Sequence, residues 1–508
     1  MAWLGSSPNR NRLVRRAGSI LQHYFSIPQR ARAGVAAVAA TVAGGIVALA
    51  VGCGNQYRPV VTPINPTGPA AFPTAQITVV SQPGFGPLPP GVTGPCAGVT
   101  YSTPAIYTLL DFSGDSVTAQ ANGGNGPITF SMESGGADVY SPNCDGTLTT
   151  AQSTTSSLLT KYVLTSTLLP GSQPTNTLLA NGDLYVTEAG LHGPTCLATN
   201  CVAQMTGSPD ALKQEIPVAP SLINLVGFTS GERIYAISQG NSGGGAQPAW
   251  GDCANPAAVT VSGEADAIET NTNTISVRLP LGICPVYGFM TPDTQRTFIM
   301  NRGSGTVTVI NSQLNAIDAA HPAIAVGAGP VFADYYRTGQ LLVTANYDSG
   351  TITIIDASLD AYGNDSATFG TVRATVAVGL HPVEVAVLQD GSRVYVANQG
   401  DIAAGTPGSV SVVSLTNYTV LKTIPLTATT NPHAIGAIYN YPIGKVYVAA
   451  QNSPYLTIIR TDTDIVSDTV EMEGNIVDMH VNAQYPGQST PGALNYQTES
   501  RSVGSGAP

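Results

Sequence analysis

The segment Val394-Tyr395-Val396-Ala397-Asn398-Gln399 (VYVANQ) decides the fold, because related phrases recur along most of the chain. The clear copies are VYVAAQ around Tyr447, LVTANY around Val343 and TFIMNR around Phe298, and the fainter copies are IYAISQ at Tyr235, LYVTEA at Tyr185 and VYSPNC at Tyr140. The aligned positions are separated by 45, 50, 63, 45, 52 and 52 residues. A repeat of this length indicates a radial or stacked architecture rather than one irregular globule.

The residues around each clear copy have the pattern of further strands. β-branched runs follow the copies at Gly305–Asn311, Gly350–Asp356, Gly408–Ser414 and Tyr455–Arg460. After a polar turn, another strand-like run is found at Thr371–Gly379, Thr419–Leu426 and Ile465–Met472. An apolar strand then opens the next unit at Pro330, Pro382 and Pro432. Period-two or fully apolar β-branched runs are typical of half-buried or buried strands, so each unit is predicted to hold four antiparallel strands.

Four strands in about 45 to 52 residues match the dimensions of a propeller blade. Packing blades around an axis buries both faces of every sheet and leaves only short edges. A solenoid fits less well, because its repeats are usually shorter and need polar caps. We therefore predict an all-β propeller of four-stranded antiparallel blades. Seven blades are favoured, and eight are possible if strands near both termini, including Ala105–Phe112, Asp115–Ala121 and Asn475–Val481, build one composite blade.

From about Cys284 to Val481 the chain resembles the YVTN family of β-propellers, whose defining phrase matches VYVAN here. The Pro-led strand, the VYVAN phrase and the two strands that follow it recur in the family's order in this region. From Ile128 to Gly282, Tyr140 and Tyr185 keep the register but lose the neighbouring letters. The resemblance implies a seven-bladed propeller that is commonly exported, and it implies no single activity.

The N-terminal 53 residues have the composition of an export signal. They contain six Arg and no Asp or Glu, followed by the apolar run Ala33–Gly52 and then Cys53. Ala50-Val51-Gly52-Cys53 resembles a bacterial lipobox, in which the Cys is lipidated and becomes the new N-terminus. An uncleaved membrane anchor and ordinary cleavage are the alternatives. The predicted organisation is an export signal at 1–53, a Pro-rich linker at 54–94, the propeller at 95–483 and a flexible tail at 484–508.

The cysteine count agrees with export, because six Cys remain after Cys53 and an even number favours disulfides in an exported chain. The blade map predicts three bonds, Cys196–Cys201, Cys253–Cys284 and Cys96–Cys144. Sequence alone allows 15 pairings of six Cys. Metal binding by these Cys is disfavoured, because no CxxC pair occurs and no His stands at ligand spacing from them. We predict no cofactor and no metal site.

The charge of the chain disfavours two classes of partner. The net charge is −11, and after Cys53 there remain 14 Lys and Arg against 31 Asp and Glu, a net of about −17. The chain has no basic patch with interleaved aromatic residues, so neither nucleic acid nor anionic headgroups are expected to bind. The membrane is expected to be reached only through the lipid anchor on Cys53. We expect a monomer.

Few residues stand out as candidates for chemistry, and no catalytic motif is present. His381 and His433 flank the Pro that opens an inner strand, and His480 lies on the last inner strand, so the three are candidates for a His-lined ligand pocket. Turn-capping is the alternative for each. Trp250, in the insertion Gly240–Cys253, is a candidate anchor for a sugar or peptide, or it packs its own loop beside Cys253.

We therefore predict a non-enzymatic binding or scaffolding module of the cell envelope whose protein, peptide or glycan ligand is unknown. One alternative is a propeller enzyme of the lactone hydrolase or oxidoreductase type, by analogy of fold alone. Such an enzyme needs His, Asp or Glu side chains that converge at one channel mouth. The other alternative is a structural surface-layer or adhesion component, which needs self-association and a large exposed patch.

Overall fold

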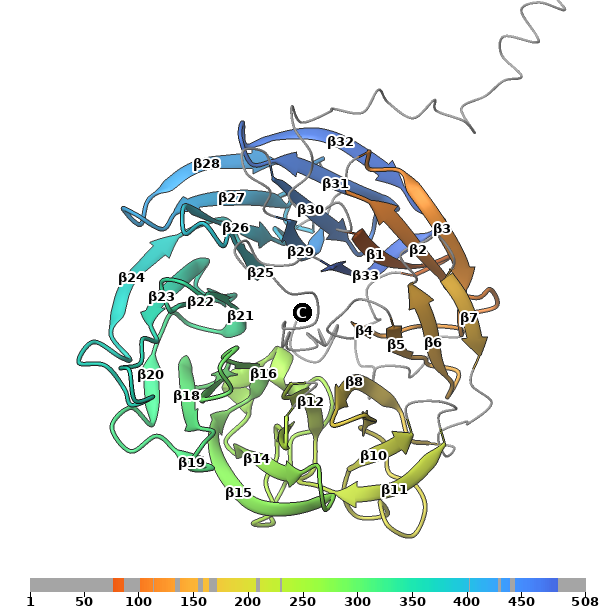
Figure 1. Cartoon of the computed structure of the whole chain (residues 1–508), viewed down its shortest axis with the longest axis vertical. Helices are drawn as coiled ribbons and strands as arrows, with labels where there is room; N and C mark the ends of the chain where they lie inside the picture. Colours follow the sequence, from red (N-terminus) through yellow and green to blue (C-terminus); the bar gives the residue numbers. More distant parts are fainter. Residues whose placement is uncertain are drawn as a thin grey trace, which may run out of the picture. The chain divides into compact units, whose positions relative to one another are not determined.

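The computed structural model describes residues 76–85, 101–112, 114–132, 138–153, 159–163, 171–206, 211–228, 231–401, 403–427, 431–438 and 444–482. The chain divides into two compact units, Met1–Pro63 and Ile64–Pro508, and every described residue belongs to the second. Within the described residues, the strands form eight antiparallel sheets around a central axis, as the blades of a propeller (Figure 1). The regular helices in these ranges are two 3-10 turns, η1 (Asp252–Ala254) and η2 (Pro256–Ala258). The predicted all-β propeller of four-stranded antiparallel blades is confirmed.

We number the blades in ring order and give their strands from the axis outward. Blade 1 contains β33 (Asn475–Asn482), β1 (Gln76–Gln82), β2 (Ile106–Asp111) and β3 (Val117–Asn122). Blade 2 contains β4 (Ser131–Met132), β5 (Asp138–Pro142), β6 (Leu148–Ser153) and β7 (Leu159–Val163). Blade 3 contains β8 (Pro174–Ala180), β9 (Asp183–Glu188), β10 (Cys201–Thr206) and β11 (Leu212–Pro217). Blade 4 contains β12 (Leu222–Val226), β13 (Arg233–Ser238), β14 (Ser262–Glu269) and β15 (Thr274–Ile283).

The second half of the ring has the same layout. Blade 5 contains β16 (Pro285–Met290), β17 (Arg296–Asn301), β18 (Thr306–Asn311) and an outer strand in two pieces, β19 (Ala316–Ile317) and β20 (Ala323–Ala325). Blade 6 contains β21 (Pro330–Tyr336), β22 (Leu341–Asn346), β23 (Thr351–Asp356) and β24 (Val372–Ala377). Blade 7 contains β25 (Pro382–Val387), β26 (Arg393–Asn398), β27 (Ser409–Ser414) and β28 (Val420–Pro425). Blade 8 contains β29 (Pro432–Ile438), β30 (Lys445–Ala450), β31 (Tyr455–Arg460) and β32 (Ile465–Glu471).

Blade 1 closes the ring, because its strands come from both ends of the described chain. β1 pairs antiparallel with β33 on one side and with β2 on the other. Seven blades are each built from one continuous stretch, and the eighth is the composite blade from both termini that the sequence allowed as the alternative. Residues 76–82, which form β1, fall within the Pro-rich linker predicted from the sequence. That assignment was wrong for these seven residues, because their pairing with β33 and β2 outweighs the Pro-rich composition around them.

Neighbouring blades are joined by the residues of the repeated phrase. The hydroxyl groups of Tyr185, Tyr235, Tyr395 and Tyr447, each on the second strand of a blade, donate to an Asn or Asp side chain of the next blade. The acceptors are, in the same order, Asn273, Asn315, Asp464 and Asp115. All four acceptors have positive φ between 51° and 55°, a conformation in which Asn and Asp are enriched. We call this contact the tyrosine clasp.

The Asn at the end of the phrase joins strands within a blade. Asn398 accepts a hydrogen bond from the amide of Gly379 at 3.1 Å and donates to the hydroxyls of Ser409 and Ser411. Asn301 and Asn346 make the same kind of bonds to Thr side chains of their own third strands. The repeated phrase therefore encodes contacts at both ends of the second strand, with an apolar stretch between them.

The core lies between the blades. The inner three strands of a blade are almost wholly buried, as in β25 and β26. In the outer strand β28 most positions are exposed. The buried apolar side chains gather in clusters that each join neighbouring blades. Burial of apolar surface on both faces is the main stabilising contribution expected for such a stack.

We expect the change Tyr395→Phe to lower the free energy of unfolding by about 1–2 kcal/mol, because the clasp to the Asp464 carboxylate is lost and the ring stays buried. Urea unfolding followed by circular dichroism measures this difference. The matched control is Tyr362→Phe, since Tyr362 is 89% exposed and its change should stay within about 0.5 kcal/mol. Equal stability of Tyr395→Phe and the wild type would contradict the clasp.

Candidate metal centre

The predicted ligand residues lie on different blades: His381 precedes β25, His433 is on β29, His480 is on β33, and Trp250 lies between β13 and β14. His381 has a φ of 54°, stacks on Tyr347 with ring centroids 4.3 Å apart, and donates from Nδ1 to the carbonyl of Gly400 at 3.0 Å. This arrangement corresponds to the turn-capping alternative. Trp250 is half-buried in the segment that leads into η1.

His480 lies on the inner strand β33, and His433, on β29 of the neighbouring blade, contacts the same strand. The Nε2 atom of His433 donates to the carbonyl of Val477 at 2.7 Å. His480 is buried, its ring lies edge-on to Phe130 at 4.4 Å, and its Nε2 lies 3.4 Å from Oδ2 of Asp478. The two histidines thus serve the packing around the composite blade. The His-lined pocket of His381, His433 and His480, and the separate role of Trp250 as a ligand anchor, stay predictions.

Two of the predicted disulfides are confirmed. Cys196 is bonded to Cys201 and Cys253 to Cys284, with Cα–Cα distances of 5.8 and 5.5 Å. Cys144 is also disulfide-bonded, but its predicted partner Cys96 lies outside the described residues, so that pairing stays a prediction. Disulfides indicate an oxidising, extracellular compartment. Across the described ranges, no helix has the length and apolar character needed to cross a membrane.

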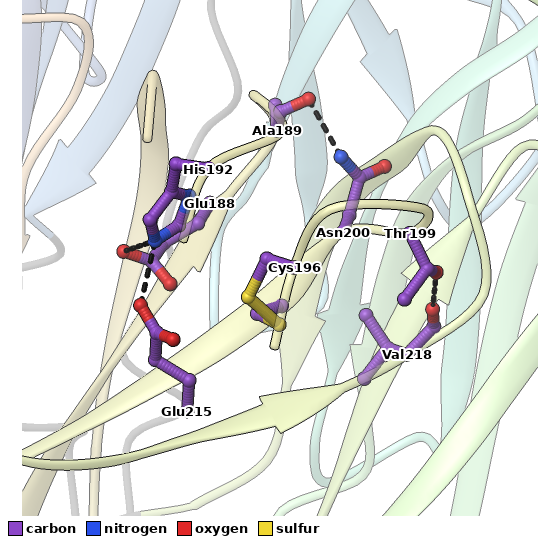
Figure 2. The surroundings of a disulfide bond; sticks show 9 residues. Glu188, Ala189, His192, Cys196, Thr199, Asn200, Glu215 and Val218 are labelled. Carbon is purple, nitrogen blue, oxygen red and sulfur yellow. Dashed lines mark hydrogen bonds and ion pairs between the residues drawn. A yellow bond between two sulfur atoms is a disulfide. The ribbon is translucent and has the colours of Figure 1, made fainter. Parts of the chain in front are cut away.

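Three ionisable side chains of blade 3 converge beside the Cys196–Cys201 disulfide (Figure 2). Nε2 of His192 lies 2.6 Å from Oε1 of Glu215 and 3.4 Å from Oε1 of Glu188. Glu188 ends β9, Glu215 lies on the outer strand β11, and His192 lies in the loop between β9 and β10. We call these three residues the blade 3 cluster.

The blade 3 cluster is buried and incompletely hydrogen-bonded. Glu188 is fully buried, and among the described residues neither of its carboxyl oxygens has a hydrogen-bond partner; the same holds for Nδ1 of His192. Burial, and then the negative charge of Glu215, raise the pKa of Glu188 to about 8. A buried carboxyl group without a hydrogen bond is costly, and the His192 imidazole 3.4 Å away is shared with Glu215.

The register of the strands shows that Glu188 replaces the structural Asn of the repeat. Glu188 pairs with Cys201 in blade 3, as Asn398 pairs with Ser409 in blade 7 and Asn346 with Thr351 in blade 6. On the outer strand, Glu215 stands opposite Ala203, where blade 7 has Thr423 opposite Ser411. Blade 3 therefore has two carboxyl groups at positions where blade 7 has an Asn and a Thr.

Blade 4 also has acidic residues at this end, but it compensates them with an arginine. Glu264 and Asp266 lie on β14, and Arg278 stands opposite Asp266 and donates to both carboxyl groups at 3.0 Å. Hydrogen bonds from Arg278 and Ser242 lower the pKa of Glu264 despite its burial, and burial raises the pKa of Asp266. The arginine position of blade 4 is occupied in blade 3 by Glu215 itself.

The donor set of the blade 3 cluster suits a divalent cation. The carboxyl oxygens, the His192 nitrogen and the Cys196 sulfur lie within 4.8 Å of one another, and the sulfur is engaged in the disulfide. One imidazole and two carboxylates are ligands of Zn²⁺ and related first-row ions, and three protein ligands leave a coordination position open. A second group, Asp318, His321 and Asp365, is more exposed, and its Asp365 is paired with Arg296 at 2.6 Å.

The sequence analysis predicted no metal site and did not single out these three residues for chemistry. Glu188 and Glu215 are 27 residues apart, and only the strand register brings them together. A signal was nevertheless present, because the faint phrase LYVTEA has Glu188 where VYVANQ has Asn398. Comparing the copies position by position would have identified this substitution.

The comparisons with known proteins show the fold alone. No family model matches the chain, and no curated protein matches it. Dihydro-heme d1 dehydrogenase NirN in complex with DHE is 11% identical, with a TM-score of 0.54 over 84% of this chain and 78% of that one. Apo AztD from Citrobacter koseri is 12% identical, with a TM-score of 0.51 over 80% of this chain and 98% of that one.

We expect Glu188→Gln to stabilise the metal-free protein by about 1–3 kcal/mol at a pH above 8, because it removes a buried carboxylate that has no hydrogen bond and is repelled by Glu215. Chemical unfolding in the presence of a chelator measures the difference. The matched control is Glu264→Gln, which breaks the pairing with Arg278 and should lower stability instead. Destabilisation by both changes would show that the Glu188 carboxylate is already compensated.

Proposed function

We propose that this protein is an exported, non-enzymatic binding propeller that holds a divalent cation between Glu188, His192 and Glu215. One observation carries the proposal: two carboxyl groups share one imidazole, since Glu188 is fully buried, has no hydrogen-bond partner in the described part of the chain, and lies 3.4 Å from the same His192 Nε2 that contacts Glu215 at 2.6 Å. In blade 4 an arginine resolves the same conflict. A bound cation would do so in blade 3.

The geometry also fits the role of a carrier or binding module. Glu188 lies on the second strand of blade 3 and Glu215 on the outer strand, so the sheet fixes these two donors. The loop between β9 and β10 supplies the third donor, His192. An open coordination position accepts water or a ligand of the partner, which suits exchange of the cation. The enzymatic and surface-layer alternatives stay predictions, because no observation made on this structure favours them.

The proposal includes export and lipid anchoring. The Arg-rich start, the apolar run and Cys53 support a lipoprotein signal, and the disulfides agree with an oxidising compartment. The VYVAN phrase supports membership of the YVTN propellers. Residues 1–53 lie outside the described residues.

Cation binding is tested on the full chain by titration calorimetry with Zn²⁺ and with Mn²⁺ after removal of metals by a chelator. We expect one cation per chain, with affinity lowered by about 100-fold or more in Glu188→Gln and Glu215→Gln, since each removes a charged ligand. Glu264→Gln should bind as the wild type does. A wild type that binds no better than Glu188→Gln would overturn the proposal.

Lipid anchoring is tested by the change Cys53→Ala in the full chain expressed in a bacterium. We expect the wild type in the membrane fraction and the variant released, because the acyl chains attached to the Cys supply the membrane affinity. Fractionation followed by immunoblotting gives the result. A variant that stays with the membrane would favour an uncleaved anchor.

A further inference from the structure

The disulfide beside the blade 3 cluster contains a fourth potential ligand. Cys196 Sγ belongs to the group of donor atoms that lie within 4.8 Å of one another, together with those of Glu188, His192 and Glu215. Its bonded partner, Cys201, pairs in register with Glu188 at the end of β9. The two sulfur atoms are therefore part of the same buried corner of blade 3 as the carboxyl groups.

The loop between β9 and β10 is held by hydrogen bonds that do not involve the disulfide. The amide of His192 donates to the carbonyl of Cys196 at 3.2 Å. The Asn200 side chain donates to the carbonyl of Ala189 at 2.7 Å and accepts from the amide of Leu222 at 3.0 Å. The amide of Gly190 donates to the carbonyl of Ser172 at 2.9 Å. These contacts remain when the sulfur–sulfur bond is cleaved, so Cys196 is expected to keep its place.

We infer that the blade 3 cluster has two ligand sets, and that reduction of the Cys196–Cys201 disulfide adds the Cys196 thiolate to Glu188, His192 and Glu215. The inference rests on the proposed cation site, whose three donors it shares. In the oxidised state the cation is held by one nitrogen donor and two carboxylates. In the reduced state it gains a soft sulfur ligand, which fills the fourth position of a tetrahedral site.

The disulfide is reduced by a dithiol, and the oxidation state of the cation does not change. One thiolate of the dithiol attacks the disulfide, forms a mixed disulfide with one Cys and displaces the other Cys as a thiolate. The second thiolate of the dithiol then breaks the mixed disulfide and displaces the remaining Cys. The dithiol becomes a cyclic disulfide, and Cys196 and Cys201 each end as a thiol. When the cation binds, the Cys196 thiol gives its proton to the solvent and the sulfur lone pair forms the new metal–sulfur bond.

The two ligand sets differ in the ions that they prefer. Carboxylate and imidazole donors accept Mn²⁺ as well as Zn²⁺, whereas a thiolate favours Zn²⁺ and Cu(I). The protein would then hold hard and borderline ions when oxidised and retain softer ions when reduced. In an exported protein such a difference ties ion retention to the redox state of the compartment.

The test uses Co²⁺ as a probe and two full-length variants that need no reductant. Cys201→Ser leaves Cys196 as a free thiol, and Cys196→Ser leaves Cys201, so the loop is unbridged in both. We expect a thiolate-to-cobalt charge-transfer band in the near ultraviolet for Cys201→Ser alone. We also expect Cys201→Ser to bind Zn²⁺ about tenfold tighter than the oxidised wild type, a change of about 1.4 kcal/mol.

The outcomes separate this inference from the proposed function. A Cys201→Ser protein without the charge-transfer band, or equal bands in both variants, would overturn the second ligand set. An oxidised wild type that binds no cation, beside a Cys201→Ser protein with the band, would overturn the proposed function in the oxidised state and leave the thiolate site standing. The triple change Cys201→Ser/Glu188→Gln/Glu215→Gln should lose the tight Zn²⁺ binding, which shows that the thiolate acts with the carboxylates.

Discussion

The pairing of β1 with β33 is the constraint on which the rest of the structure depends. A ring of sheets covers every blade face only when the first and last blades meet, and here one blade is assembled from both ends of the described chain. Side chains reinforce the junction: Asn475 donates to the carbonyl of Phe85 at 2.6 Å, and Ser81 to that of Glu473 at 3.3 Å. These contacts join segments about 390 residues apart, so their loop-closure entropy is offset only once the intervening blades are stacked.

Within the ring, the apolar and the polar positions of the repeated phrase make different contacts. The apolar middle of each second strand fills the space between sheets, and the polar ends set how one sheet meets the next. The tyrosine clasp joins four pairs of neighbouring blades among the described residues. In three of these pairs an Arg or Lys two residues before the Tyr makes a second contact with the next blade. Arg233 reaches the carbonyl of Ser312, Arg393 reaches Asp464, and Lys445 reaches Asp115.

The sequence predicted the strands that carry the repeated pattern and also three strands of the composite blade, β2, β3 and β33. Strands of blades 6 to 8 were predicted closely, because each blade carries its own copy of the apolar pattern. β1 was missed because its pairing partner stands at the other end of the chain and its surroundings are rich in Pro. The blade 3 cluster was missed for a related reason. His192 lies in a loop, and Glu188 and Glu215 become neighbours only through the register of three strands.

In a repeat protein, equivalent positions of different blades can be compared with one another. Blades 3 and 4 differ from blade 7 at the same corner. Both replace the neutral hydrogen-bonding corner of blade 7 by acidic residues. In blade 4 the third partner is Arg278, which is half-exposed and reaches inward to two carboxyl groups. In blade 3 the equivalent position is Glu215, and among the described residues the imidazole of His192 contacts both carboxyl groups. Hydrophobic stacking alone places no demand on charge at this corner, so a blade can carry an uncompensated pair only at a cost in stability. A bound cation would remove that cost, and the blade 3 cluster supplies one nitrogen and two carboxyl donors for it.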